Sequence, residues 1–258
     1  MVKEIISIKN EQLKKWKKLQ TKKGRLASQQ YLIEGFHLVE EAFKTHQQIE
    51  AVLYTKHGKE KWNSFLHPFE KSQKVLVSDE VMKKISTLPN PQGIAAVLNL
   101  KTDSQLPLNL SGSWLLLDQV QDPGNVGTMI RSAAALGWTG IILGEGSADL
   151  YQSKVLRAMQ GSHFYMKIFQ GDLQDWIPQL KKQGFKIYGT DINKNATPIF
   201  EVEKTSNLAI ILGNEGSGVN ANLLKMTDKN IYIPLSAHTE SLNVSIAAGI
   251  LMHHFKLS

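Results

Sequence analysis

The hydrophobic positions of the first hundred residues alternate between short continuous runs and helical spacing. Leu13, Trp16 and Leu19 recur every three residues, which predicts one face of a helix. Ser78 precedes two acidic residues, which is typical of the N-cap of another helix. The pattern predicts helices over 9–20, 36–43 and 79–85, strands over 31–34, 51–54, 75–77 and 94–98, and a basic loop over 21–30. We therefore expect a small α/β unit here.

A polar stretch with Pro107 and Gly112 follows, and strands and helices alternate after it to the end of the chain. The predicted strands cover 114–117, 140–143, 164–169, 186–190, 208–212 and 231–233, and the predicted helices cover 125–136, 151–159, 173–183 and 241–255. This alternation favours an α/β fold with a mainly parallel sheet and helices on both faces. The last helix is apolar on nearly all sides at its start, so we expect it to be buried.

These patterns predict a basic α/β domain over 1–100, a linker over 101–113 and a larger α/β domain over 114–258. Two loops in the larger domain come directly after short apolar strands, over 212–218 and 233–245. Loops at the carboxyl ends of parallel strands are where α/β proteins usually bind ligands. We therefore expect the ligand site at these two loops.

Composition excludes several classes of protein. The chain has 258 residues, is 42% hydrophobic and contains no cysteine, which excludes disulfides, thiolate metal sites and cysteine nucleophiles. No apolar run reaches the roughly 18 residues of a membrane span, and the N-terminus lacks an apolar signal core. We expect no membrane contact and a cytoplasmic location.

The net charge of +7 comes entirely from residues 1–105, which hold 18 Lys and Arg against 11 Asp and Glu. The excess is densest in a run with no acidic residue between Glu11 and Glu34. Such a run can be an ordinary solvated helix face, but its charges repel one another unless a polyanion neutralises them. We expect nucleic-acid binding, with contacts from Lys14, Lys17, Lys18, Lys22, Lys23 and Arg25.

The first candidate motif of the larger domain runs from Asp118 to Arg131, with a Pro-Gly turn before a predicted helix. Asn125 is either the N-cap of this helix or a functional residue. Arg131 follows two turns later, among Ile130, Ala133 and Ala134. A cation on a helix that is otherwise expected to be buried needs an anionic partner, which favours a function for Arg131.

The two loops carry the other candidates. The first has three glycines in six residues but continues Gly218-Val219-Asn220, without the Gly-Lys-Ser/Thr ending of a P-loop, so nucleotide hydrolysis is disfavoured. Glu215 would repel phosphate but could orient a cationic or hydroxyl-bearing group. Ser241 is either an N-cap or functional, and Asn243 needs a partner if it is buried. No histidine spacing indicates a metal site, and no Gly-x-Ser-x-Gly elbow indicates a serine hydrolase.

These segments together resemble the SpoU branch of the SPOUT superfamily of RNA methyltransferases. The resemblance depends on four patterns, Asp122-Pro123-Gly124-Asn125-x-Gly127-x-x-x-Arg131, Arg157-Ala158-x-x-Gly161-Ser162-x-Phe164, Gly213-Asn214-Glu215-x-x-Gly218, and Ile233-Pro234 with Glu240-Ser241-Leu242-Asn243-Val244-Ser245. The first hundred residues are similar to the family's small substrate-binding domain, through Leu32-Ile33-Glu34-Gly35-x-x-Leu38-Val39-x-Glu41-Ala42. Leu235 and Ala237 stand where the family usually has Met and Gly.

The resemblance implies a C-terminal trefoil knot, a homodimer formed through the larger domain, and S-adenosylmethionine as cofactor. It implies methyl transfer to a ribose 2′-hydroxyl of tRNA or rRNA, and the basic N-terminal domain favours rRNA. The implied catalytic residues are Arg131, Asn125, Glu215, Ser241 and Asn243, and the implied cofactor residues are Gly213, Ile233, Leu242 and Asn243. The alternative is a catalytically inactive RNA-binding protein with the same fold.

Overall fold

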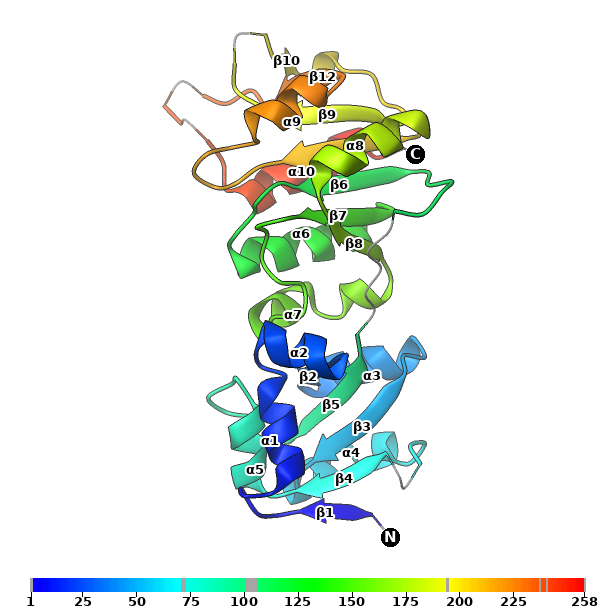
Figure 1. The fold of residues 1–258 in the computed structure, drawn as a ribbon, viewed down its shortest axis with the longest axis vertical. Coiled ribbons are helices and arrows are strands. Elements are labelled where there is room, and N and C mark those ends of the chain that lie inside the picture. The colour runs from blue at the N-terminus through cyan, green and yellow to red at the C-terminus, as the bar shows by residue number, and fades with distance from the viewer. Residues whose placement is uncertain are drawn as a thin grey trace. The chain divides into compact units, whose positions relative to one another are not determined.

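The computed structural model of the chain describes residues 2–70, 73–100, 106–193, 195–236, 238–239 and 241–257. The chain divides into two compact units, and Figure 1 shows their elements coloured along the sequence. The first unit contains residues 1–101 together with 151–164, and the second contains 102–150 and 165–258. In the described part of the chain, none of the helices has both the length and the apolar character of a membrane span.

The first unit is built on a mixed five-stranded sheet with the order β1-β4-β3-β5-β2. β5 runs antiparallel to β2 and β3, while β1, β4 and β3 pair in parallel. Its strands are β1 (Lys3–Ile5), β2 (Gln30–Glu34), β3 (Ile49–Tyr54), β4 (Lys74–Val77) and β5 (Ile94–Asn99), and its helices are α1 (Glu11–Lys18), α2 (Lys22–Ser28), α3 (Phe36–Lys44), α4 (Lys56–Leu66), α5 (Asp79–Ile85) and α7 (Ser153–Met159).

The basic segment after α1 is a helix, not the predicted loop. Thr21 caps α2 by accepting a 3.1 Å hydrogen bond from the amide of Gly24, and a Cβ on Gly24 would lie 2.0 Å from the carbonyl oxygen of Lys18. The turn between α1 and α2 therefore requires glycine. Elsewhere in this unit the predicted strands and helices are present, and Ser78 caps α5 as expected. β1 and α4 were not predicted.

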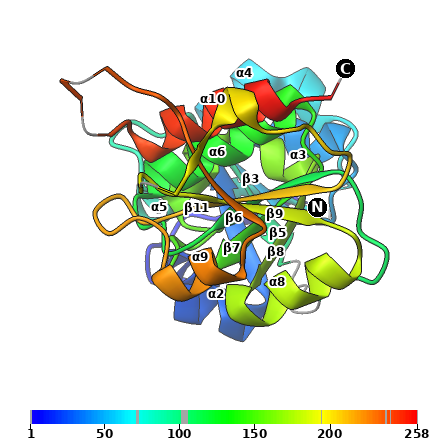
Figure 2. The same ribbon diagram turned by 90° about the horizontal axis from the view of Figure 1, so that it is seen from above.

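The second unit contains a seven-stranded sheet with the order β10-β12-β9-β11-β6-β7-β8, and every pair of neighbours is parallel. Helices α6 and α10 cover one face, and α8 and α9 cover the other (Figure 2). The strands are β6 (Ser113–Leu117), β7 (Gly140–Gly144), β8 (Lys167–Gly171), β9 (Lys186–Thr190), β10 (Thr197–Pro198), β11 (Leu208–Leu212) and β12 (Lys229–Tyr232), and the helices are α6 (Pro123–Leu136), α8 (Leu173–Lys182), α9 (Ala221–Met226) and α10 (Val244–Phe255). The predicted parallel α/β fold is confirmed.

Two expectations for the second half of the chain need correction. Part of the predicted strand over 164–169 is a 3₁₀ turn at Ser162–Phe164, and β8 begins only at Lys167. Helix α10 is not buried all round, because Ile246 and Ile250 are 55% and 38% exposed. Some apolar residues of α10 instead lie in the core, some line a cavity described below, and some lie on the open surface.

The expected linker over 101–113 lies partly outside the described residues, which resume at Leu106. Leu106 and Leu110 are buried in the core of the second unit. The Leu110 amide donates to Gln183 Oε1 over 2.6 Å, and the Gly112 amide donates to Asn207 Oδ1 over 3.0 Å. The described half of this segment is therefore packed against the sheet domain.

Candidate functional site

A cavity of about 600 Å³ opens at the carboxyl ends of β9, β11 and β12. Because these strands are parallel, the loops that follow them meet at one edge of the sheet. The cavity is lined by Thr190 to Ile192 after β9, by the loop after β11, by Ile231 to Ile233 and Leu235 at β12, and by Ser241 to Val244, Ala247 and Leu251 at the start of α10. Its volume is in the usual range for small-ligand sites, roughly 300–1,000 Å³.

The loop after β11 is shaped by close backbone approaches. A Cβ on Gly213 would lie 2.1 Å from the carbonyl carbon of Gly218, and Gly218 itself has a φ of +71°. Asn214 and Gly218 exchange two backbone hydrogen bonds of 3.0 Å. The side chain of Asn214 accepts from the amides of Gly216 and Ser217 and donates to the carbonyl of Gln119 over 2.9 Å. These contacts close the loop tightly on itself, with Gly213 at the cavity wall.

A chain of hydrogen-bonded side chains connects this loop to the starts of α6 and α10. Asn125 Nδ2 donates to Glu215 Oε1 over 3.0 Å, and Asn243 Nδ2 donates to Asn125 Oδ1 over 3.1 Å. Glu215 also accepts from the amides of Gln121 and Asp122, each at 3.2 Å. The structure therefore joins Asn125, Glu215 and Asn243, three of the predicted catalytic residues, although they are far apart in the sequence.

The environment of Glu215 favours its charged form. Partial burial acts to raise the pKa of Glu215, but the hydrogen bonds from Asn125 and from backbone amides outweigh it. The pKa of this carboxyl consequently lies below its ordinary value. Glu215 is an acceptor that organises the site, and its oxygens are already engaged by protein donors.

Neither Asn125 nor Ser241 is the N-cap of the helix that follows it. Asp122 caps α6 by accepting from the Asn125 amide over 2.9 Å, so Asn125 is the third residue of the helix and its side chain is left to bond Glu215 and Asn243. Asn243 caps α10 through Ser245 and Ile246, and Ser241 precedes the helix at the cavity wall. The interpretation of Asn125 or Ser241 as an N-cap is wrong.

Arg131 lies on the exposed side of α6, contrary to the expectation of buried surroundings. The residues of α6 that face the core are Val126, Gly127, Met129, Ile130 and Ala133. Within the ranges that the structure describes, the guanidinium has no hydrogen bond or ion pair with another residue, and Arg131 does not line the cavity. The anionic partner that we expected is therefore not supplied by the described part of the chain.

All of the predicted cofactor residues, Gly213, Ile233, Leu242 and Asn243, line the cavity. Asp191 also lines it and was not predicted, although its place directly after the strand over 186–190 was a usable signal. Among the described lining residues there are two carboxylates, Asp191 and Glu215, and no lysine or arginine. Ala237 and Glu240, in the third loop, lie outside the described residues.

The predicted RNA-binding residues separate into two groups. Lys14, Lys17, Lys18, Lys22 and Lys23 are exposed on α1 and α2 of the first unit, with Lys14 Nζ 2.6 Å from Glu11 Oε1. Arg25 is only 4% exposed, and its Nη1 donates to the carbonyl of Leu19 over 2.8 Å. The prediction that Arg25 contacts RNA is therefore wrong, because this side chain closes the turn between the helices.

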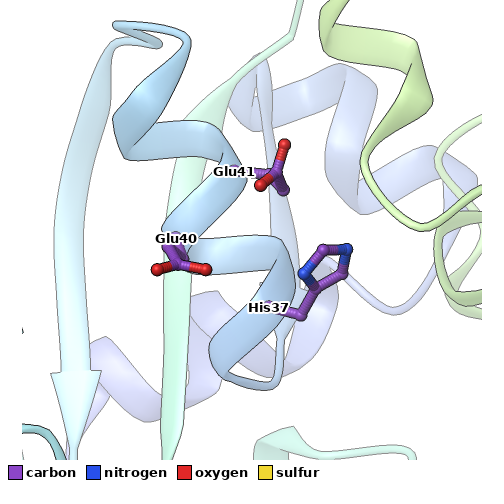
Figure 3. A group of neighbouring side chains, drawn as sticks. All are labelled: His37, Glu40 and Glu41. Atoms are coloured by element: carbon purple, nitrogen blue, oxygen red, sulfur yellow. The ribbon is translucent and has the colours of Figure 1, made fainter.

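The described residues include one group with the composition of a metal site, His37, Glu40 and Glu41 on α3 (Figure 3). Their candidate ligand atoms lie within 4.8 Å of one another. Lys44 Nζ, however, lies 3.1 Å from Glu40 and 3.5 Å from Glu41, and hydrogen bonding to Glu40 raises the pKa of Lys44. An ammonium group already provides the counter-charge for this cluster.

The fold and the cavity together define an α/β domain that binds a small ligand at the carboxyl edge of a parallel sheet. Comparison with known families identifies it more closely. Residues 113–253 match the SpoU rRNA Methylase family, and residues 10–96 match the MRM3-like substrate binding domain. The chain therefore belongs to the SpoU rRNA methylase family.

Individual relatives extend over nearly the whole chain. The 23S rRNA (guanosine(2553)-2′-O)-methyltransferase RlmP of Bacillus subtilis (strain 168) is 41% identical over 255 residues, which covers 99% of this chain and 100% of that protein. The crystal structure of an AdoMet-bound rRNA methyltransferase from Sinorhizobium meliloti superposes with a TM-score of 0.87 at 26% identity, covering 98% and 97% of the two chains. A putative RNA methyltransferase of the TrmH family from Porphyromonas gingivalis superposes with a TM-score of 0.83 at 29% identity, covering 97% and 98%.

Proposed function

We propose that this protein transfers a methyl group from S-adenosylmethionine to a ribose 2′-hydroxyl of 23S rRNA, at a guanosine. Family membership supports the reaction class, and the relationship to RlmP of Bacillus subtilis supports the RNA and the nucleoside. The observation that carries the proposal is the hydrogen-bonded chain of Glu215, Asn125 and Asn243 at the edge of the cavity. It joins three of the four family patterns into one site.

The cavity fits the cofactor in size, charge and lining. S-adenosylmethionine, when bound, supplies an electrophilic methyl group on a sulfonium. It carries two cationic groups against one carboxylate, and the described lining has carboxylates but no cationic side chain. Gly213 brings bare backbone to the cavity wall, and backbone amides and carbonyls suit the edges of an adenine. Gly213, Ile233 and Leu242 would hold the cofactor through their backbones, with Asn243 at the polar end.

The residues at the mouth act on the ribose. Asn125 and Asn243 are fixed by Glu215 and by the cap of α10, so their amide groups are pre-organised to hold a hydroxyl-bearing substrate. Ser241 lies beside them at the cavity wall. Arginine has a pKa above about 12, so Arg131 is poorly suited to act as a base. We assign it to the phosphate next to the target ribose and to the developing alkoxide, which a guanidinium stabilises electrostatically.

The first unit would bind the RNA through the exposed lysines of α1 and α2. Lys14, Lys17, Lys18, Lys22 and Lys23 are exposed on these two helices, with Glu11 paired to Lys14, and we call this set the α1–α2 lysine surface. Phosphate contacts of this kind supply affinity without reading sequence. The domain boundaries predicted from sequence, 1–100, 101–113 and 114–258, remain part of this proposal, and so does a cytoplasmic location, where ribosomal RNA would be available to the enzyme.

We also propose that the chain forms a homodimer through the second unit and that its C-terminal part is knotted. The exposed apolar side chains of Ile246 and Ile250 on α10 support the dimer, because they follow one another by one helical turn on the open surface. The knot is supported by the strand order, in which β12 returns to pair with β9 and β10. Light scattering of wild type and of Ile246→Glu tests the dimer, and a monomeric wild-type protein would refute it.

The function is tested by mapping ribose methylation by mass spectrometry in 23S rRNA from cells with and without the protein. We expect one guanosine to lose its methyl group without the protein and to regain it with wild type but not with Arg131→Ala. Calorimetry with S-adenosylmethionine separates this proposal from the alternative of an inactive RNA-binding protein. Unchanged methylation together with no cofactor binding would establish that alternative.

A further inference from the structure

One of the family patterns, Arg157 to Phe164, has no part in the cavity. None of its residues is among those that line the cavity, and residues 151–164 belong to the first compact unit together with residues 1–101. The pattern nevertheless lies inside the segment that matches the SpoU family, residues 113–253. The chain therefore passes between the two units three times, at 101/102, at 150/151 and at 164/165.

Arg157 of α7 meets a carboxylate that is almost fully buried. Its Nη1 lies 3.4 Å from Glu34 Oε1 and donates to Thr87 Oγ1 over 2.6 Å, and the Glu34 side chain is only 8% exposed. The hydroxyls of Ser86 and Thr87 and the Thr87 amide also donate to Glu34. A buried carboxylate with this set of neutral donors still needs a counter-ion, and Arg157 supplies it.

Two further contacts hold the ends of the segment. At its start, the ring of Tyr151 packs 4.5 Å from the ring of buried Tyr31, and near its end His163 Nε2 lies 3.3 Å from Tyr31 Oη. Gly161 has a φ of +86°, and a Cβ on it would lie 3.1 Å from the Cβ of Glu41. Burial raises the pKa of Tyr31 well above its ordinary value, which keeps its hydroxyl protonated.

Apart from Thr87, the partners named for this segment belong to one other region of the chain. Tyr31, Glu34 and Glu41 lie in or beside the pattern over residues 32–42, by which the first unit resembles a substrate-binding domain. Leu156 also lines a small pocket with Leu32 and Leu38 of that pattern. The two patterns are therefore the two halves of one junction within the first unit.

The connections of the segment suggest what the junction does. Residue 151 comes seven residues after Gly144, the last residue of β7. Residue 164 is followed after two residues by β8, so both ends run into neighbouring strands of the parallel sheet. Holding residues 151–164 on the first unit therefore adds two short restraints to the connection at 101/102. Without this docking, the first unit would be joined to the sheet through one segment alone.

We propose that Arg157 and Glu34 form a latch that fixes residues 151–164 to the RNA-binding unit, and that this latch positions bound RNA for methyl transfer. Both are positioning residues, since neither lines the cavity. The inference rests on the proposed RNA methylation. Opening the latch leaves the α1–α2 lysine surface and the cavity intact, and it lowers the fraction of bound RNA that reaches the cavity in a productive arrangement.

The test compares Arg157→Ala and Arg157→Gln with Gln152→Ala as the matched control, because Gln152 is exposed in the same segment and its side chain makes no capping bond. We expect the two Arg157 variants to retain wild-type dissociation constants for S-adenosylmethionine and for RNA. The single-turnover methylation rate should fall about 10- to 100-fold, as expected for loss of a charge-assisted hydrogen bond. Amide hydrogen exchange over 151–164 should rise in the same variants, and Gln152→Ala should change none of these quantities.

A second substitution keeps the test decisive if a variant is poorly folded. Removing the buried charge with Glu34→Gln in the Arg157→Ala background should restore part of the rate, because the carboxylate that has lost its counter-ion is gone. A wild-type rate with faster exchange over 151–164 would overturn the positioning role. Weaker RNA binding with a smaller salt dependence would show instead that Arg157 contacts phosphate. If the wild-type protein does not methylate RNA, the proposed function is refuted but the latch is not. Hydrogen exchange over residues 151–164 would still test the latch.

Discussion

Asn243 donates to Asn125 over 3.1 Å, and this hydrogen bond joins the first turns of α10 and α6 across 118 residues of sequence. Each asparagine has a second commitment. Asn243 caps α10 through Oδ1, and Asn125 donates to Glu215. The two amide groups are therefore held in one orientation by the fold before any substrate arrives, which is the condition for precise positioning of a reacting hydroxyl.

Asn125→Ala should lower the single-turnover methylation rate about 10- to 100-fold, because it frees both Glu215 and Asn243 from a charge-assisted network. The cofactor dissociation constant should change much less, since Asn125 does not line the cavity. Asn222→Ala is the control, as Asn222 is exposed on α9 and also lies outside the cavity wall. An unaltered rate in Asn125→Ala would remove this residue from the site.

Arg131→Lys should retain RNA binding and lose most of its turnover, because lysine lacks the planar fork that holds a phosphate and an alkoxide together. The free energy of unfolding should stay within about 0.5 kcal/mol of wild type, because Arg131 is exposed and its side chain has no hydrogen bond or ion pair among the described residues. Single-turnover methylation and thermal unfolding measure the two effects. Near wild-type turnover would contradict the role given to Arg131.

Charge reversal of Lys17 and Lys18 together should weaken RNA binding and reduce its dependence on salt. The loss of two phosphate contacts changes the slope of log K against log salt by about 1.4 to 1.8. The control is the double variant Lys182→Glu and Lys186→Glu, which changes the net charge by the same amount. Lys182 is the last residue of α8 and Lys186 the first residue of β9, so neither belongs to the α1–α2 lysine surface. Equal salt slopes for the two double variants would exclude the α1–α2 lysine surface as the RNA contact.

Gly213→Ala should weaken cofactor binding about tenfold or more, since its Cβ would lie 2.1 Å from the backbone of Gly218 and overpacking of this kind costs about 1–3 kcal/mol. Gly216→Ala in the same loop is the matched control, because its Cβ would meet only Asn214 Oδ1 at 3.6 Å. Calorimetry with S-adenosylmethionine compares the two. Similar affinities would mean that the backbone at Gly213 does not shape the cofactor site.

The lowered pKa of Glu215 predicts a dependence on pH. A carboxyl whose pKa is lower in the folded state stabilises the fold above its unfolded pKa, and this contribution is lost as the pH falls through the folded value. The stability difference between wild type and Glu215→Gln should therefore be constant near neutral pH and shrink below the ordinary value of 4.5. Denaturant unfolding at several pH values measures it, and a difference that grows on acidification would contradict the assignment.

The sequence predicted most of this architecture because the core strands of the second unit are continuous apolar runs. β11 coincides with the predicted range, and β6 differs from its prediction by one residue. Prediction from the local sequence pattern was wrong where a single contact determines the structure. The helix α2 depends on the Thr21 cap and on the absence of a Cβ at Gly24, and the burial of Arg25 follows from that turn.

The sequence also predicted most of the residues that the structure brings together at the candidate site. Gly213, Ile233, Leu242 and Asn243 line one cavity, and Asn125, Glu215 and Asn243 are bonded to one another, so the patterns identified groups that the fold brings together. Their individual roles stay predictions. The sequence could not show that Arg131 is exposed, because spacing along a helix gives a face but not what covers it. Nor could it show that Arg157 has its partner 123 residues earlier, at Glu34.

The three passages of the chain between its units limit how this enzyme can be shortened. A truncated protein that begins at Leu106 would keep the whole SpoU segment but lose β2, which contacts α7, and the residues that line a pocket with the buried Leu156. Such a fragment would expose the apolar side chains of α7 that pack against the first unit. The first unit is equally incomplete without residues 151–164, so neither unit can be exchanged between relatives as a simple N-terminal module.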